Sequence, residues 1–170
     1  MPRARNELWR ELGRDRDTVC GLRTYRPGDE PAVFALVKTV LSQYGLKTNP
    51  EETDRDIQDI CKSYLENGGQ FKVLERDGQI IGSYGIFRVS PAVCELRKMY
   101  LYEQFRGAGL GRMMMEDALD TAKVLGYQEM VLETNACLKE AIALYCAFGF
   151  EEFQADHLSD RCDMAMRKAL

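Results

Sequence analysis

Apolar side chains recur at intervals of three and four residues in four segments of the chain, a spacing that predicts amphipathic helices. These segments are 31–44, 50–66, 113–125 and 138–148. The first follows a turn at Pro27-Gly28-Asp29-Glu30, and its apolar face comprises Val33, Leu36, Val37, Val40 and Leu41. The second begins with an N-cap and first-turn pair, Asn49-Pro50, and directs inward Ile57, Ile60, Cys61, Tyr64 and Leu65.

Runs rich in β-forming residues, partly alternating, predict strands around these helices. Two of them, 71–75 and 79–89, flank Asp77-Gly78, which is typical of a hairpin turn between antiparallel strands. The others are 21–26, 94–101, 129–135, 150–155 and 161–168. This order predicts one α/β domain over residues 20–170, built on a mixed, mostly antiparallel sheet. Residues 1–19 have no clean period, and we expect a mobile segment there.

The composition is that of a soluble globular domain, with 45% hydrophobic and 29% charged residues in a chain of 170. No apolar stretch approaches the roughly 18 residues that a membrane-spanning helix needs. The N-terminus lacks the apolar centre of a secretory signal, so we expect a cytoplasmic protein without a membrane partner. The net charge of −4 argues against nucleic-acid binding and mildly favours a cationic substrate. A homodimer is left open.

Cysteine and histidine usage limits the chemistry. The six cysteines show no Cys-x-x-Cys pair, so reduced and mostly buried thiols are expected. His157 is the only histidine, which excludes a histidine-rich metal site, and we expect no metal cofactor. A cysteine nucleophile at Cys137 or Cys146 is conceivable, but neither has a candidate histidine partner. Packing is the expected role of both.

Glycines and arginines gather between the strand-like run 94–101 and the helix 113–125. Glycines let the backbone approach a ligand, and the free amides of a first helical turn attract anions, so this loop is a candidate pyrophosphate site. A P-loop would need Gly-Lys-Ser/Thr, and the dinucleotide fingerprint would need a further glycine; both are absent. What remains is an Arg-x-x-Gly-x-Gly pattern within Arg106-Gly107-Ala108-Gly109-Leu110-Gly111-Arg112.

This loop resembles the acyl-CoA-binding loop of the GCN5-related N-acetyltransferase (GNAT) superfamily. A second pattern, Ala141-Ile142-Ala143-Leu144-Tyr145 followed by Gly149-Phe150, is similar to a later motif of the same superfamily. Both occur in the expected order and separation. The resemblance implies a GNAT-like fold, in which the strand before the glycine loop and the strand after its helix splay apart to admit the cofactor.

The resemblance also implies roles for individual residues. Acetyl-CoA is the implied co-substrate, with its pantetheine arm paired to the backbone of Met99, Tyr100 and Leu101. The pyrophosphate is implied to lie on the loop, at Arg106, Gly107, Ala108, Gly109, Leu110, Gly111 and Arg112. Tyr145 is the implied general acid and also a cofactor contact. For Tyr145 a core aromatic, and for Arg112 a solvated side chain, are the structural alternatives.

The general base is open between two glutamates. Glu133 lies near the end of its strand with a spacing to Tyr145 that matches the base and acid pair of relatives acting on protein N-termini. Glu95 is the competitor, because other relatives place the base on that strand; either could instead be ion-paired or solvated. Relatives commonly carry a cofactor-binding asparagine where this chain has Leu138, and Asn135 is the candidate replacement.

The resulting hypothesis is an acetyl-CoA-dependent N-acetyltransferase in which a primary amine attacks directly in a ternary complex. The acceptor is a free amino acid, a polyamine-like amine or a protein amino group. Acceptor specificity is expected from the two N-terminal helices, including Tyr44, and from the loop 154–160. A non-catalytic acyl-CoA sensor and a purely structural domain are the alternatives.

Overall fold

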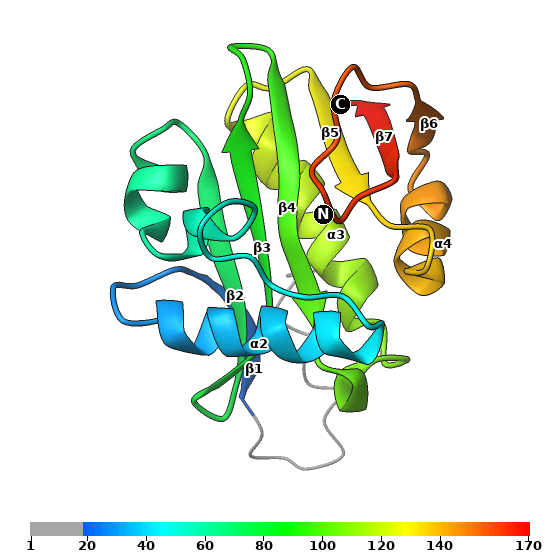
Figure 1. The fold of residues 1–170 in the computed structure, drawn as a ribbon. Helices are drawn as coiled ribbons and strands as arrows, with labels where there is room; N and C mark the ends of the chain where they lie inside the picture. The colour runs from blue at the N-terminus through cyan, green and yellow to red at the C-terminus, as the bar shows by residue number, and fades with distance from the viewer. Residues whose placement is uncertain (1–18) are drawn as a thin grey trace, which may run out of the picture.

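The computed structural model describes residues 19–170, arranged as a seven-stranded sheet with helices on both faces (Figure 1). The sheet order is β1-β2-β3-β4-β5-β7-β6, and every neighbouring pair is antiparallel except β4 and β5. The mixed, mostly antiparallel α/β fold is therefore confirmed. Apart from Val19, the segment predicted to be mobile lies outside the described residues. The strands are β1 (Cys20–Thr24), β2 (Gln70–Arg76), β3 (Gln79–Arg88), β4 (Val93–Leu101), β5 (Glu129–Thr134), β6 (Glu151–Phe153) and β7 (Met164–Ala169).

Helices cover both faces of this sheet. In Figure 1, α2 crosses the front of the sheet and α3 lies behind it, while α4 packs beside the β5–β7 end. The helices and turns are α2 (Glu30–Gln43), η1 (Arg55–Ile57), η2 (Cys61–Leu65), η3 (Glu103–Phe105), α3 (Leu110–Val124) and α4 (Lys139–Ala147). Among the described residues, no helix is long and apolar enough to cross a membrane.

The sequence predictions that concern a single helix or turn are confirmed. The five apolar residues predicted for the inner face of α2 are all buried. Asp77 and Gly78 both adopt positive φ, of 50° and 80°, as a tight two-residue hairpin turn requires, and β2 pairs antiparallel with β3. Gly149 ends α4 in the left-handed region, where a side chain would be strained.

The prediction of a continuous α-helix over residues 50–66 is wrong. Residues 50–66 form turns, the 3₁₀ helix η1 and the short π-helix η2. The Asn49 side chain accepts the Glu51 amide, as an N-cap would, but the chain then bends so that the amide and carboxylate of Asp54 both bond to the Asn49 backbone. Tertiary bonds to Asp54, described below, favour this bend. The inward positions survive, since Ile57, Ile60 and Tyr64 are buried.

Two of the cysteine expectations also need correction. All six cysteines are free thiols, and Cys94 is buried on β4. Cys137 and Cys146 are exposed, so they do not fill the core. Cys137 lies in the turn before α4, and Cys146 lies near the end of that helix.

Candidate functional site

A cleft opens where β4 and β5 stop pairing. The two parallel strands are in register only at Cα pairs from Val93 with Glu129 to Glu95 with Val131, and both continue beyond them. The unpaired ends line a cavity of about 1020 Å³ that reaches from the glycine loop to the C-terminal loop. The splayed strands predicted by the family resemblance are therefore present.

A bulge in β4 exposes main-chain groups to this cleft. The pairing with β3 shifts between Ser83 and Gly85, and Lys98 adopts a positive φ of 53°. Ser83 Oγ donates a hydrogen bond of 2.7 Å to the Lys98 carbonyl, which holds the distorted backbone. Met99, Tyr100 and Leu101 follow the bulge and line the cleft, at the positions predicted for the pantetheine contact.

The glycine loop has the geometry that its sequence predicts. Gly107 and Gly109 have φ of 80° and 81°, and Gly109 is the N-cap of α3. A Cβ built on either would meet nothing within 4 Å, so the space beside the first helical turn is open. Gly111 is the second residue of α3, where a Cβ would touch Leu144 of α4 at 3.8 Å. Ala108 is exposed and Leu110 is buried, so of these two only main-chain groups can serve a ligand.

The two arginines of the loop have protein partners. Arg106 donates to the Leu101 carbonyl at 3.1 Å, the Tyr44 hydroxyl at 3.1 Å and the Gln43 amide oxygen at 3.2 Å. The Tyr44 hydroxyl in turn donates to Glu140 at the start of α4, which the sequence did not predict. Arg112 is largely exposed and pairs with Glu116 one turn later. Arg106 thus links the loop to α2 and α4, while Arg112 matches the solvated alternative yet still lines the cleft.

Tyr145 lies on α4 with its ring buried in the cleft wall, 8% exposed. Burial, reinforced by nearby Tyr100, raises the pKa of the Tyr145 phenol well above its ordinary value. On the neighbouring strand, Thr134 is 3% exposed and its Oγ1 has no hydrogen-bond partner among residues 19–170. Asn135 is held locally, because its amide donates to the Arg161 carbonyl and accepts from the Cys137 amide. Thr134 is a cleft-lining polar group that sequence reasoning missed.

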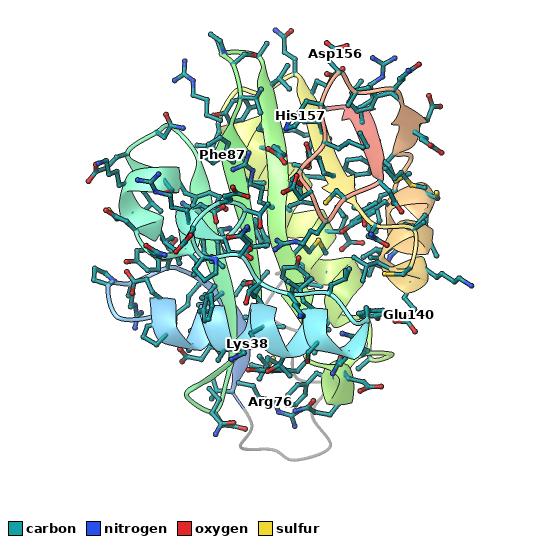
Figure 2. The ribbon with its side chains drawn as sticks, viewed as in Figure 1. Lys38, Arg76, Phe87, Glu140, Asp156 and His157 are labelled. Atoms are coloured by element: carbon teal, nitrogen blue, oxygen red, sulfur yellow. The ribbon has the colours of Figure 1, made fainter. Side chains whose placement is uncertain are left out.

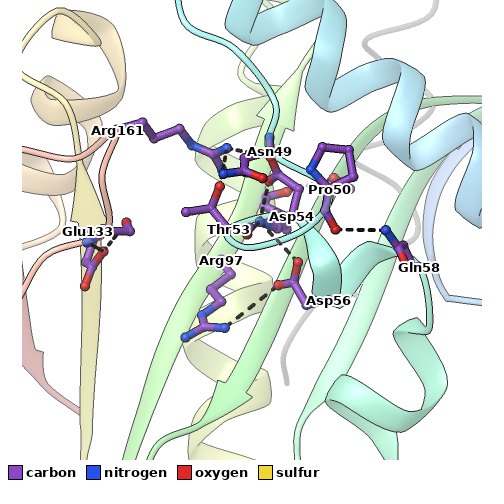
Figure 3. A network of polar contacts seen from close by, with 12 residues as sticks. Asn49, Pro50, Thr53, Asp54, Asp56, Gln58, Arg97, Glu133 and Arg161 are labelled. Carbon is purple, nitrogen blue, oxygen red and sulfur yellow. Dashed lines mark hydrogen bonds and ion pairs between the residues drawn. The ribbon is translucent and has the colours of Figure 1, made fainter.

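Glu95 and Glu133 lie on one face of the splayed strands and both line the cleft. Glu95 is bound by Arg97, with Oε2 accepting from Nε at 2.7 Å and lying 2.5 Å from Nη2. Burial raises the pKa of Glu95; Arg97 opposes this shift, and the charge of Glu133 adds to it. Glu133 Oε2 accepts hydrogen bonds from the Ser159 amide at 3.0 Å and hydroxyl at 2.5 Å (Figure 3).

A buried ion network that the sequence did not predict lies at the end of the cleft formed by the C-terminal loop, here called the far end because the glycine loop forms the other (Figure 3). Asp54 is 0% exposed and binds Lys98 Nζ at 2.7 Å and the Arg161 guanidinium at 2.6 and 2.8 Å. Burial alone would raise the pKa of Asp54, but Arg161 and Lys98 outweigh it and lower that pKa to about 2. The available signal was Lys98 itself, which continues the inward positions of Cys94 and Leu96 with a charged side chain.

The C-terminal loop closes this end. Residues 154–163 join β6 to β7, and Asp156 and His157 lie together on this loop (Figure 2). Four residues of the loop, His157, Ser159, Asp160 and Arg161, line the cleft, and the contribution of the loop to an acceptor site stays a prediction. Within residues 19–170 no cluster of three or more His, Cys, Asp or Glu side chains is arranged to hold a metal ion.

Comparison with known proteins gives a consistent result. A model of the acetyltransferase (GNAT) family matches residues 34–150. An uncharacterized N-acetyltransferase of Escherichia coli (strain K12), YjgM, is 35% identical over 128 residues, covering 72% of this chain and 77% of that protein. The chain spans about half the length of the mouse and human N-acetyltransferase 8 relatives that it also matches.

Solved structures share the fold. An acetyltransferase of the GNAT family from Staphylococcus aureus Mu50 superimposes with a TM-score of 0.81 at 18% identity, covering 89% of this chain and 99% of that one. A phosphinothricin acetyltransferase from Sinorhizobium meliloti, solved with acetyl-CoA, gives a TM-score of 0.70 at 20% identity, covering 89% of this chain and 88% of that one.

Proposed function

Because the chain belongs to the acetyltransferase (GNAT) family and is an acyltransferase, we propose that it transfers an acetyl group from acetyl-CoA to a primary amine. The observation that carries the proposal is one continuous cleft that joins the open glycine loop at the start of α3 to two carboxylates and a buried phenol. Transfer proceeds by direct attack of the amine while both substrates are bound.

The fit to acetyl-CoA rests on features of the residues themselves. Gly107 and Gly109 leave open space beside the free amides of α3, which suits a diphosphate at a helix N-terminus. The Thr134 hydroxyl, which has no partner among residues 19–170, is buried in the β5 wall of the cleft, where the pantetheine arm would offer amide donors and acceptors. A buried hydroxyl without a partner is costly, so a ligand that supplies one is stabilised. The Sinorhizobium enzyme, solved with acetyl-CoA, supports the same assignment.

Tyr145 is proposed as the hydrogen-bond and proton donor to the departing sulfur. Burial raises its pKa, so the phenol stays protonated until a thiolate develops beside it. Its place on the inner side of α4, beside the splayed strands, makes this contact accessible to a ligand in the cleft.

Glu95 is proposed as the group that takes the amine proton, with Glu133 as the charge that draws the ammonium to it. A general base works best when its pKa approaches the working pH, and burial moves Glu95 in that direction. Glu133 Oε2 accepts two hydrogen bonds from Ser159, which hold that carboxylate in place beside the C-terminal loop.

A cysteine acyl carrier is less well supported than direct attack. Cys137 and Cys146, the earlier candidates, do not line the cleft. Cys162 does line the cleft, but burial raises the pKa of its thiol. The charges of Glu133 and Glu95 raise this pKa further, whereas the hydrogen bond with Ser159 lowers it. A protonated thiol is a poor nucleophile.

The deciding experiment combines binding with turnover. Acetyl-CoA affinity is measured by calorimetry, and release of free thiol is followed with a panel of amines. Gly109→Glu introduces an anion at the proposed diphosphate position and is expected to abolish binding. Gly109→Ala places a side chain at the same positive φ without the charge, and therefore serves as the control. Equal affinity of Gly109→Glu and Gly109→Ala would refute the site. Tight binding without thiol release on any amine would instead favour a sensor.

A further inference from the structure

The far end of the cleft carries more negative charge than the protein itself neutralises. The cationic groups that line it are Arg97, Lys98 and Arg161, together with the ring of His157. Arg97 is bound by Glu95, Lys98 lies between Asp54 and Asp56, and Arg161 is bound by Asp54. Each arginine and lysine of this wall is thus already paired with a carboxylate of the protein.

Three further carboxylates line the same end and have no arginine or lysine partner among residues 19–170: Glu52, Glu133 and Asp160. Glu133 is held by Ser159, and Glu52 accepts a hydrogen bond of 3.1 Å from the Asn49 side chain. Glu52 and Asp160 are exposed. Glu52 lies two residues before Asp54, and Asp160 directly precedes Arg161, so each flanks one partner of the Arg161–Asp54 ion pair. The excess charge therefore lies on three segments: the turn 50–54, the end of β5 and the loop 154–163.

Asp56 gives an independent indication of a donor-rich ligand. Its side chain is 8% exposed and lines the cleft, and its Oδ1 has no hydrogen-bond partner within residues 19–170. Lys98 Nζ lies 3.2 Å from this oxygen as an ion pair, but its hydrogen bonds go to Thr53 and Asp54. A buried carboxylate oxygen with spare acceptor capacity is satisfied by an N–H donor from a ligand.

Resting on the function proposed above, we propose that the acceptor is a small aliphatic diamine or polyamine, with a second cationic nitrogen and no carboxylate beside the reacting amine. The excess carboxylates attract the second nitrogen, while every arginine and lysine that lines this end of the cleft among residues 19–170 is already paired with a carboxylate of the protein. A small molecule is favoured over a folded protein, because the bonds of Arg161 to Asp54 join the turn 50–54 to the C-terminal loop at this end of the cleft.

Three amines of equal chain length test the charge rule directly: 1,4-diaminobutane, butylamine and 4-aminobutanoate. They offer the same reacting amine, and the far end is cationic, neutral or anionic. We expect kcat/KM to fall in that order, with about a threefold to tenfold gap between the diamine and the monoamine, because two partly exposed charge contacts contribute a few-fold each. Salt should narrow the gap.

A double variant, Glu52→Gln with Asp160→Asn, is expected to bring the diamine-to-monoamine ratio toward one. Asp156→Asn is the matched control, because Asp156 is an exposed acid of the same loop that does not line the cleft, and its ratio should equal that of the unchanged protein. A ratio unaffected by the double variant would overturn the proposal.

Other outcomes separate the inference from the function beneath it. If 4-aminobutanoate or amino acids are the better acceptors, or only peptides are acetylated, the charge rule fails while the acetyltransferase function stands. If acetyl-CoA binds but no amine releases thiol, the catalytic function itself fails, and the acceptor proposal falls with it.

Discussion

Replacing Asp54 by asparagine should destabilise the protein more than any other single charge removal around the cleft. Asp54 is fully buried and joins three parts of the chain: the turn after α2, the β4 bulge through Lys98, and the C-terminal loop through Arg161 (Figure 3). Asparagine keeps the size and can still accept the Asn49 amide, which the carboxylate accepts at 2.8 Å. What disappears is the charge that compensates two largely buried cations.

The magnitude follows from the pKa of Asp54. A pKa lowered from 3.8 to about 2 corresponds to about 2.5 kcal/mol of stabilisation of the ionised carboxylate in the folded state. Removing one partner of a buried ion pair costs about 3 to 5 kcal/mol, because the remaining charge is left uncompensated. Asp56 still lies 3.2 Å from Lys98, which limits the loss. We therefore expect Asp54→Asn to lower the free energy of unfolding by about 3 kcal/mol at neutral pH.

The pH dependence has a definite sign. Because the folded-state pKa of Asp54 is depressed, its contribution is present above the unfolded pKa near 4 and is lost as the pH falls toward about 2. Urea denaturation of the unchanged protein and of Asp54→Asn at a series of pH values measures both quantities. The difference between the two proteins should be largest above about pH 5 and should shrink by about 2 kcal/mol at pH 2, with the remainder lost only at lower pH.

Asp156→Asn is the control for this series, since Asp156 is exposed and its removal should change the free energy of unfolding by less than about 0.5 kcal/mol. If Asp54→Asn does not fold, Arg161→Lys removes the forked contact while retaining the charge, and should cost less. A loss below about 1 kcal/mol for Asp54→Asn at neutral pH, or a difference that does not change with pH, would refute the role assigned to this network.

Three further predictions concern the proposed chemistry. Tyr145→Phe should lower kcat by about a hundredfold with little change in acetyl-CoA affinity, and equal turnover would remove the phenol from catalysis. Glu95→Gln should abolish the acidic limb of the pH profile of kcat/KM. In the unchanged protein the midpoint of that limb should lie above the ordinary carboxyl pKa of about 4.3, because burial raises the pKa of Glu95. If the same limb persists in the variant, Glu95 is not the base. Thr134→Val keeps the side-chain shape and should weaken acetyl-CoA binding about threefold to tenfold by calorimetry, since only the hydroxyl is lost; unchanged affinity would show that the ligand does not use this group.

Patterns of neighbouring residues predicted those helices and turns that a short stretch of chain is able to specify. The apolar face of α2, the hairpin at Asp77-Gly78 and the glycines before α3 were all predictable, because spacing and positive φ are properties of adjacent residues. The segment 50–66 was not, because its helical spacing competes with long-range bonds to Asp54 that bend the chain.

The side-chain partners in the cleft needed the tertiary structure. Sequence alone offered Glu95 and Glu133 as equal candidates, and only folding shows that one is bound by Arg97 and the other by Ser159. Likewise the loop arginine Arg106 suggested a phosphate ligand, whereas the fold brings it to Gln43 and Tyr44, more than sixty residues away. Burial, which controls the pKa of each group, depends on what distant segments cover.

The order of strands and helices, the glycine loop and the Leu144-Tyr145 pattern were determined by the sequence, because hydrophobic spacing and backbone conformation act over a few neighbouring residues. The tertiary structure decided the residue at which β4 and β5 stop pairing, the pairing of Lys98 with Asp54, and the surplus of carboxylates at the far end of the cleft. Those features depend on charges and strands that are distant in the chain and meet only when the sheet forms.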